Sequence, residues 1–334
     1  MTLFKQALFK GGLASAALLT AVSAQAVTIA QTGNTTVKIG GYVKLDMLFS
    51  DFSDGSVSGS GLDGLGREFY IPAVTPVTPV NGTDENSNTY FDMHARQTRI
   101  NFSTESKIGE HKLKSYIEID FMATITNANN IITNGYSPEL RHAFIEYDKW
   151  LFGQTWSTFQ NVESLPESVD FIGNTDGGIF VRQPQVRYTD GPWEFAIENP
   201  ETTVTTTGGP RVIADDNQLP DFVARYNLKH NDLSLALAGL VRQLTYNNND
   251  LGGNVDDSIL GWGISVTGKY MLNKDDIRFG LNFGGGLGRY IGLNTANGAA
   301  VDNNNQLEAI AFHLQPERVW HFRSTGQKGC SLQE

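Results

Sequence analysis

Alternation of apolar and polar side chains is the most regular feature of this chain. In residues 37–49, every second position is apolar except for Gly41, and the intervening positions include Lys38, Lys44 and Asp46. A period of two residues indicates a β-strand whose two faces meet different surroundings. The same alternation recurs in residues 111–123, 220–229, 232–242, 261–270 and 276–288.

The alternating segments are long. They run over nine to thirteen residues, whereas strands of soluble proteins usually have about five or six. A tilted strand that crosses a bilayer needs about 9 to 11 residues. We therefore predict an all-β fold, a transmembrane antiparallel β-barrel with about twelve countable strands.

Short and long connections alternate strictly between these strands. The short ones are rich in Gly, Asn and Asp, which favour tight turns, and they lie at residues 106–110, 148–149, 190–192, 229–231 and 273–275. The long ones are polar and lie at residues 50–91, 124–138, 157–182, 200–219, 244–258 and 289–306. Outer-membrane barrels sort their loops in this way, and a soluble sandwich has no reason to do so.

The alternation also predicts sidedness, with the apolar face toward lipid and the charged face toward a water-filled lumen. A Lys or Arg on the lipid side costs about 2–4 kcal/mol at mid-bilayer. A shift of one residue would turn every lumen charge toward lipid, so the pattern also specifies the register. Two segments fit less well. Arg96 and Arg99 have opposite parities, which indicates either a bulge or a position of Arg96 above the membrane, and Arg141 shares the parity of Ile145.

The N-terminus predicts a signal peptide over residues 1–26. Lys5 and Lys10 precede an apolar run, and Ala24-Gln25-Ala26 places small residues where a cut after Ala26 needs them. The alternative is a membrane anchor, but the run is shorter than the roughly 20 residues of a spanning helix. The predicted barrel then occupies residues 27–312, and an atypical tail occupies residues 313–334.

Composition narrows the chemistry. The formal charge is −11 and no basic stripe is present, which argues against a nucleic-acid partner. Cys330 is the only cysteine, so no internal disulfide forms. The six histidines have no metal-ligand spacing, and the sequence shows no convincing catalytic constellation. We expect no enzyme activity, no metal and no cofactor.

Inward parity places ten cations and seven acids on the lumen wall. The cations are Lys38, Lys44, Lys112, Lys114, Arg187, Arg225, Lys229, Arg242, Lys269 and Arg278. The acids are Asp46, Glu118, Asp120, Glu146, Glu194, Glu198 and Asp221. Either these charges pair across neighbouring strands, or the excess cations form a constriction that draws small anions by focusing the field.

Residues 157–182 are the best candidate for a constriction loop. The segment carries three aromatic side chains, which would hold it against the inner wall, and five charged ones. The aromatic residues are Phe159, Phe171 and Phe180, and the charged residues are Glu163, Glu167, Asp170, Asp176 and Arg182. An ordinary external loop is the alternative, and the sequence does not decide between them.

Several stretches resemble the DcaP-type trimeric outer-membrane channels, porins of Gram-negative bacteria. The stretches are RHAFIEYDKWLFGQTWSTF, RQPQVRYT, FAIENPE and LPDFVARY, with IGGYVKLDMLFSDFSDG and ARQTRINF near the N-terminus. The resemblance runs from about residue 37 to about residue 311. It implies a sixteen-stranded barrel that assembles as a homotrimer and takes up small anionic solutes such as dicarboxylates.

The resemblance also implies arginines in the constriction, which we carry over to Arg99, Arg182, Arg187 and Arg225. Four further wall cations complete the candidate solute-binding set, namely Lys44, Lys114, Arg242 and Arg278. The C-terminal HLQPERVWHFRSTGQKGCSLQE departs from the family, because it has no alternation and no final aromatic residue. We interpret it as the product of a shifted reading frame with about four strands missing; a twelve-stranded barrel with a periplasmic extension is the alternative.

The sequence thus predicts an outer-membrane porin for small hydrophilic solutes that prefers anions, whose other partners are the lipid bilayer and two further copies of the chain. The alternatives are a structural or adhesive barrel without a solute path, or a non-functional truncated porin.

Overall fold

The computed structural model describes residues 20–52, 87–122, 133–166, 177–207, 211–214, 216–248, 255–312 and 317–319, together with the single positions 55, 57, 67, 75 and 168. The chain forms two compact units, and each is described by itself. The first comprises residues 1–29, 38–102 and 118–140, and the second comprises residues 30–37, 103–117 and 141–334.

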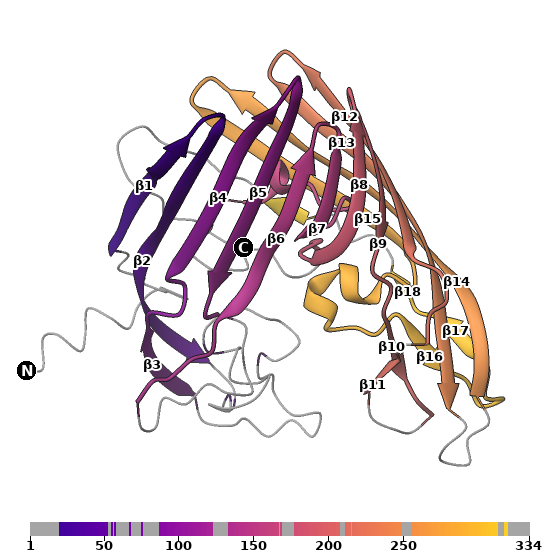
Figure 1. The fold of residues 1–334 in the computed structure, drawn as a ribbon. Coiled ribbons are helices and arrows are strands. Elements are labelled where there is room, and N and C mark those ends of the chain that lie inside the picture. Colours follow the sequence, from indigo (N-terminus) through magenta and orange to yellow (C-terminus); the bar gives the residue numbers. More distant parts are fainter. Residues whose placement is uncertain are drawn as a thin grey trace, which may run out of the picture. The chain divides into compact units, whose positions relative to one another are not determined.

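One large sheet contains most of the strands (Figure 1). Its hydrogen-bonded order is β1-β2-β4-β5-β6-β7-β8-β9-β12-β13-β14-β15-β18, so most neighbours in the sheet are also neighbours along the chain. β3 pairs with β2, and β19 pairs with β15. The bounds are β1 Thr20–Thr32, β2 Thr35–Phe52, β3 Asn88–His94, β4 Arg99–Ile108, β5 His111–Asp120, β6 Glu139–Tyr147, β7 Trp150–Trp156, β8 Arg182–Asp190, β9 Trp193–Glu198, β12 Asp221–His230, β13 Leu233–Asn248, β14 Val255–Leu272, β15 Asp275–Gly285, β18 Ala311–Phe312 and β19 Glu317–Val319.

The alternating segments fold into the strands that the pattern predicts. Consecutive strands from β6 to β9 and from β12 to β15 pair antiparallel, and tight turns join β6 to β7, β8 to β9, β12 to β13 and β14 to β15. Asp148, Asn231 and Asn273 adopt positive φ angles in three of these turns, a conformation that Asp and Asn tolerate better than other side chains. Turn chemistry and alternation therefore agree on the same register.

The structure corrects several predicted boundaries. β13 and β14 pair from Leu233↔Tyr270 to Asn248↔Val255, so most of the predicted connection 244–258 is strand. The predicted loops 200–219 and 289–306, together with residues 307–309, form a second, four-stranded sheet in the order β11-β10-β16-β17. Its strands are β10 Thr202–Thr205, β11 Arg211–Ala214, β16 Ala299–Val301 and β17 Leu307–Ala309. β10 and β16 pair across almost a hundred residues, as in Val204↔Ala299, which a local pattern does not reveal.

β1 is a strand that the alternation did not predict. It begins at Thr20, before the predicted cleavage site after Ala26, so a cut there would leave only residues 27–32 of it. In the predicted tail 313–334, residues 317–319 form β19, and the other tail residues lie outside the described ranges. The signal peptide and the domain bounds remain predictions.

The two irregular arginines have separate explanations. Residues 95–98 form a turn between β3 and β4, in which the Thr98 amide donates to the Ala95 carbonyl at 3.1 Å. Arg96 and Arg99 therefore differ in parity because Arg96 lies in this turn, and not because of a bulge within a strand. In β6, Arg141 and the next residue, His142, are both buried, so the alternation changes within this strand.

The distribution of exposure is inverted relative to a soluble protein. Large apolar side chains of the predicted lipid face are exposed, including Val43 at 68 % and Ile264 at 51 %, whereas Asp221 on the opposite face is fully buried. A continuous apolar surface of this kind needs an apolar environment. In the described part of the chain, no helix is long and apolar enough to span a membrane.

Candidate functional site

Residues 157–166 follow β7 and lie against the inward side of β12, β14 and β15. Arg225 of β12 donates to the carbonyl of Gln160 at 2.6 Å. The Asn161 amide donates to the hydroxyl of Thr267 in β14 at 3.1 Å, and Arg278 of β15 donates to the carbonyl of Leu165. We call residues 157–166 the inward segment. The inward arrangement of this part of the predicted loop is therefore observed, and the external one is not.

The short helical turn η2, Val162–Ser164, lies within the inward segment and contains Glu163. Glu163 accepts a hydrogen bond from Ser234 at 2.6 Å and pairs with Lys229 at 3.1 Å, beside the tight turn between β12 and β13. These two interactions lower the pKa of Glu163, the hydrogen bond from Ser234 more than that from Lys229. The carboxylate is thus charged at neutral pH and ties the segment to the wall.

Two of the three predicted aromatic anchors are described. Phe159 is buried and packs edge-on against Tyr290, with ring centroids 5.9 Å apart. Phe180 packs edge-on against Trp156 at 5.0 Å. Phe171, together with Glu167, Asp170 and Asp176, lies outside the described residues.

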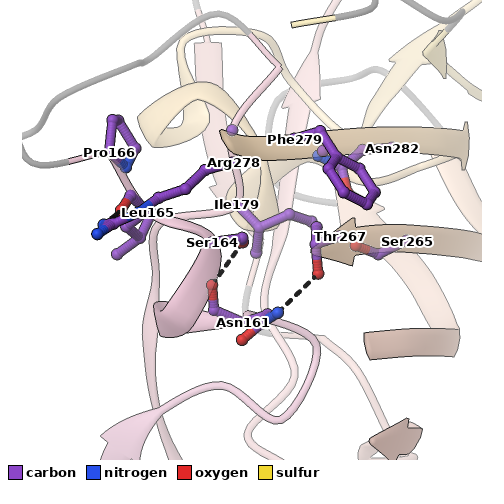
Figure 2. Close-up of a pocket in the computed structure, with 12 residues that line it drawn as sticks. Asn161, Ser164, Leu165, Pro166, Ile179, Ser265, Thr267, Arg278, Phe279 and Asn282 are labelled. Carbon is purple, nitrogen blue, oxygen red and sulfur yellow. Dashed lines mark hydrogen bonds between the residues drawn. The ribbon is translucent and has the colours of Figure 1, made fainter. Parts of the chain in front are cut away.

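Figure 2 shows a pocket between the inward segment and the wall. Ser164, Leu165 and Pro166 come from the inward segment, and Arg278 and Asn282 come from β15. Arg278 also pairs with Asp276, from its Nε to Oδ1 at 2.8 Å. The guanidinium therefore joins the wall to the segment rather than standing alone in the pocket.

Arg187 and Arg225 share one carboxylate. Arg225 approaches Glu194 Oε2 at 2.5 Å, whereas Arg187 approaches the same oxygen at 4.0 Å. Glu198 and Glu146 also act electrostatically on Arg187, so Glu194 is one of several acidic groups that offset these two cations.

The other predicted cations in the second unit are spread along the sheet. Lys114 pairs with Glu146 at 3.2 Å. Arg182 lies over the Trp156 ring, 5.2 Å from its centroid. Arg242 is almost fully buried, and its Nε lies 3.3 Å from Asp221. The burial of Arg242 excludes direct contact with a passing solute.

In the first unit, Lys44 pairs with Asp46 at 2.9 Å. Arg99 lies 3.5 Å from Glu118 and 3.6 Å from Asp120. Five of the candidate cations, namely Arg99, Lys114, Arg187, Arg225 and Arg242, pair with a carboxylate on a neighbouring strand. Lys44 and Arg278 pair with a carboxylate of their own strand. Pairing across strands, one of the two interpretations of the wall, is therefore observed at five of these positions. A solute-binding role for these residues remains a prediction.

Sequence reasoning missed Arg289 and Tyr290, because residues 289–306 read as an external loop. They belong to the helical turn η3, Gly288–Tyr290, which precedes η4, Gly292–Asn294. Arg289 donates to the Gln183 side chain at 2.5 Å and to the Asn199 carbonyl at 3.0 Å. An Arg-Tyr pair after a glycine run was the only local signal, and it does not specify an inward position.

Comparison with known proteins decides the family. A sequence model of the DcaP outer membrane protein family matches residues 33–316. The chain belongs to this family. The DcaP assignment agrees with the exposed apolar face, and it places the protein in the bacterial outer membrane as a member of a channel family.

One solved structure supports the DcaP fold. The crystal structure of the outer membrane channel DcaP of Acinetobacter baumannii has a TM-score of 0.60 and 23% identity, and the match covers 83% of this chain and 71% of that chain. OmpT, an outer membrane protein of Vibrio cholerae, has a TM-score of 0.44 and 12% identity, covering 77% of this chain and 66% of that chain. No curated protein matches the sequence.

Proposed function

We propose that the protein is a passive channel for small hydrophilic solutes and that it prefers small anions such as dicarboxylates. The channel family supports the first part. The charges around the inward segment support the second. We further propose that solutes pass without chemical change, and that the channel assembles as a homotrimer.

The observation that carries the anion preference is a local charge imbalance. Among the described side chains that belong to the inward segment, contact it, or belong to ion pairs linked to those contacts, five are cations and four are carboxylates. The cations are Arg187, Arg225, Lys229, Lys269 and Arg278, and the carboxylates are Glu163, Glu194, Glu198 and Asp276. An excess of one sign in a narrow path concentrates ions of the other sign.

Planar-bilayer recording tests both parts. We expect measurable single-channel current from the purified protein, and a reversal potential under a salt gradient that indicates anion preference. An absence of current would favour a structural or adhesive barrel. A reversal potential of the cation-selective sign would refute the preference while leaving the channel in place.

The variant Arg187→Gln tests whether the charge excess causes the preference, because the closer Arg225–Glu194 pair stays intact. We expect the anion-to-cation permeability ratio to fall roughly twofold, since a unit charge in water acts with about 0.5 kcal/mol at about 8 Å. Lys149→Gln is the matched control, because Lys149 pairs with Asp190 at an exposed turn. Equal ratios in both variants would contradict the proposal.

The homotrimer is tested by mass measurement of the detergent-solubilised protein, before and after chemical cross-linking. A single species with three copies supports it, and a monomer at all protein concentrations contradicts it.

A further inference from the structure

A buried polar cluster joins two stretches of chain that fold inward. One is the first part of the inward segment, residues 157–160, and the other is residues 286–292, which include η3. The cluster consists of Glu198 at the end of β9, Asp221 at the start of β12, Arg242 in β13 and Tyr290 in η3. All four side chains are at most 2 % exposed, so they have no access to a passing solute.

Glu198 holds the first stretch. The hydroxyl of Ser157 donates to Glu198 Oε2 at 2.8 Å, and the backbone amide of Thr158 donates to Oε1 at 2.7 Å. Both carboxylate oxygens therefore bind the point at which the chain turns inward after β7. A carboxylate that accepts several hydrogen bonds is a strong anchor for the backbone that supplies them.

Tyr290 holds the second stretch. Its hydroxyl lies 2.8 Å from Asp221 Oδ2 and 3.1 Å from Glu198 Oε2. Burial, followed by the nearby charges of Glu198 and Asp221, raises the pKa of Tyr290 well above its ordinary value, so the phenol remains a donor. The hydroxyl thus lies between two carboxyl groups that would otherwise face each other.

Arg242 supports the second stretch from the other side of Asp221. Its Nε lies 3.3 Å from Asp221 Oδ1, and its Nη1 lies 3.4 Å from the carbonyls of Gly286 and Leu287. The two inward stretches also contact each other directly, because the Phe159 ring packs edge-on against the Tyr290 ring, with the ring centroids 5.9 Å apart. The cluster is therefore where both stretches are fastened to the wall.

We propose that Glu198 and Tyr290 are positioning residues that hold the two inward stretches in place and so set the width of the channel. This inference rests on the proposed channel function. Neither residue contacts the solute, and both act through the backbone that they fasten.

The first experiment compares Tyr290→Phe with the intact protein. The variant keeps the ring that packs on Phe159 but removes the hydroxyl between Glu198 and Asp221. We expect the undocked population of the inward stretches to rise about 10- to 100-fold, the factor that corresponds to losing a hydrogen bond to a charged group. In bilayer recordings this change appears as frequent transitions to a larger conductance.

A spin label at Val162 reports the segment position independently of current. Val162 is exposed in η2, and the background variant C330S removes the native thiol. We expect the label to become more mobile in Tyr290→Phe. Tyr270→Phe is the matched control, because Tyr270 lies exposed on the lipid-side parity of β14, and it should leave both the current and the label unchanged.

Conservative replacement separates positioning from a general loss of structure. Glu198→Gln keeps an oxygen for the Thr158 amide and should retain a steady current and an immobile label. Glu198→Ala removes both acceptors and should behave like Tyr290→Phe. Each variant is first shown to be folded by its heat-dependent gel migration.

The outcomes distinguish the two proposals. If the intact protein carries no current, the channel proposal fails, and the label at Val162 still tests the fastening role. If the intact protein conducts, and both Tyr290→Phe and Glu198→Ala leave the current and the label unchanged, the positioning proposal is wrong. Equal disturbance by Glu198→Gln and Glu198→Ala would also overturn it.

Discussion

Strands β12 to β15 and the inward segment are built in different ways. The strands pair with their neighbours along the chain in a continuous antiparallel register, and tight turns join β12 to β13 and β14 to β15. The inward segment is held by side chains that lie about 65 to 113 residues away, such as Arg225, Thr267 and Arg278. Local periodicity therefore determines how the strands of the wall pair, whereas polar contacts between distant residues determine the position of the inward segment.

The largest expected effect concerns the lipid face of the wall. Ile264→Arg places a charge in the middle of β14 on the exposed apolar side. We expect a loss of about 2–4 kcal/mol in the free energy of unfolding, the cost of Arg at the bilayer midplane. Urea titration of the protein in lipid vesicles measures the change.

Ile264→Leu is the control for Ile264→Arg, and it should change stability little. A comparably small effect of both substitutions would mean that this face does not meet hydrocarbon.

A second test concerns β7, the strand that leads into the inward segment. Gly153 has a φ of 129° and faces the Ala143 carbonyl so closely that an added Cβ would lie 2.2 Å from that oxygen. We expect Gly153→Ala to cost about 1–3 kcal/mol in the free energy of unfolding, the range for a strained backbone conformation. Gly239→Ala is the control in the same assay, because an added Cβ at Gly239 meets nothing within 4 Å.

A third test concerns the contact of Glu163 in the inward segment with Ser234 and Lys229. The folded-state pKa of Glu163 is lowered, mainly by the Ser234 hydrogen bond, so its contribution is present above the ordinary Glu pKa and is lost as the pH falls through the lowered value. We expect a spin label at Val162 to become more mobile in acid. In Glu163→Gln the mobility should be the same at neutral and acidic pH, and an unchanged acid response in that variant would exclude Glu163 as its cause.

The smallest expected effect concerns the exposed turns. Lys149 and Asp190 form an ion pair at 2.5 Å, but both side chains are more than half exposed. Solvent and salt screen such pairs. We expect Lys149→Gln to leave the unfolding midpoint unchanged within the error of a urea titration. A clear loss of stability would show that this exposed ion pair contributes to folding despite the screening by solvent and salt.

Much of the fold was predictable because it rests on local rules. The alternation around Val43 and Asp46 identified both faces, and the exposed Val43 and buried Asp46 confirm it. The turn at Asn231 followed from its residue type. Sequence reasoning overestimated the loop near residues 244–258, because polar residues on a lumen-facing strand resemble loop residues.

The candidate site was less predictable. The alternation showed that Arg225 and Arg278 face inward. It did not show that both donate hydrogen bonds to backbone carbonyls of the inward segment. The Arg-Tyr pair after the glycine run did not specify an inward position for Tyr290, since its partners Glu198 and Asp221 are 92 and 69 residues away in the chain.

The sequence by itself determined which side of each strand meets lipid, where the hairpins turn and which family the chain resembles, because each depends on neighbouring residues or on short motifs. Only the tertiary structure decided which loop turns inward, which cations are neutralised and what holds the inward stretches. Those features arise from hydrogen bonds and ion pairs between distant residues, whose geometry no period along the chain contains.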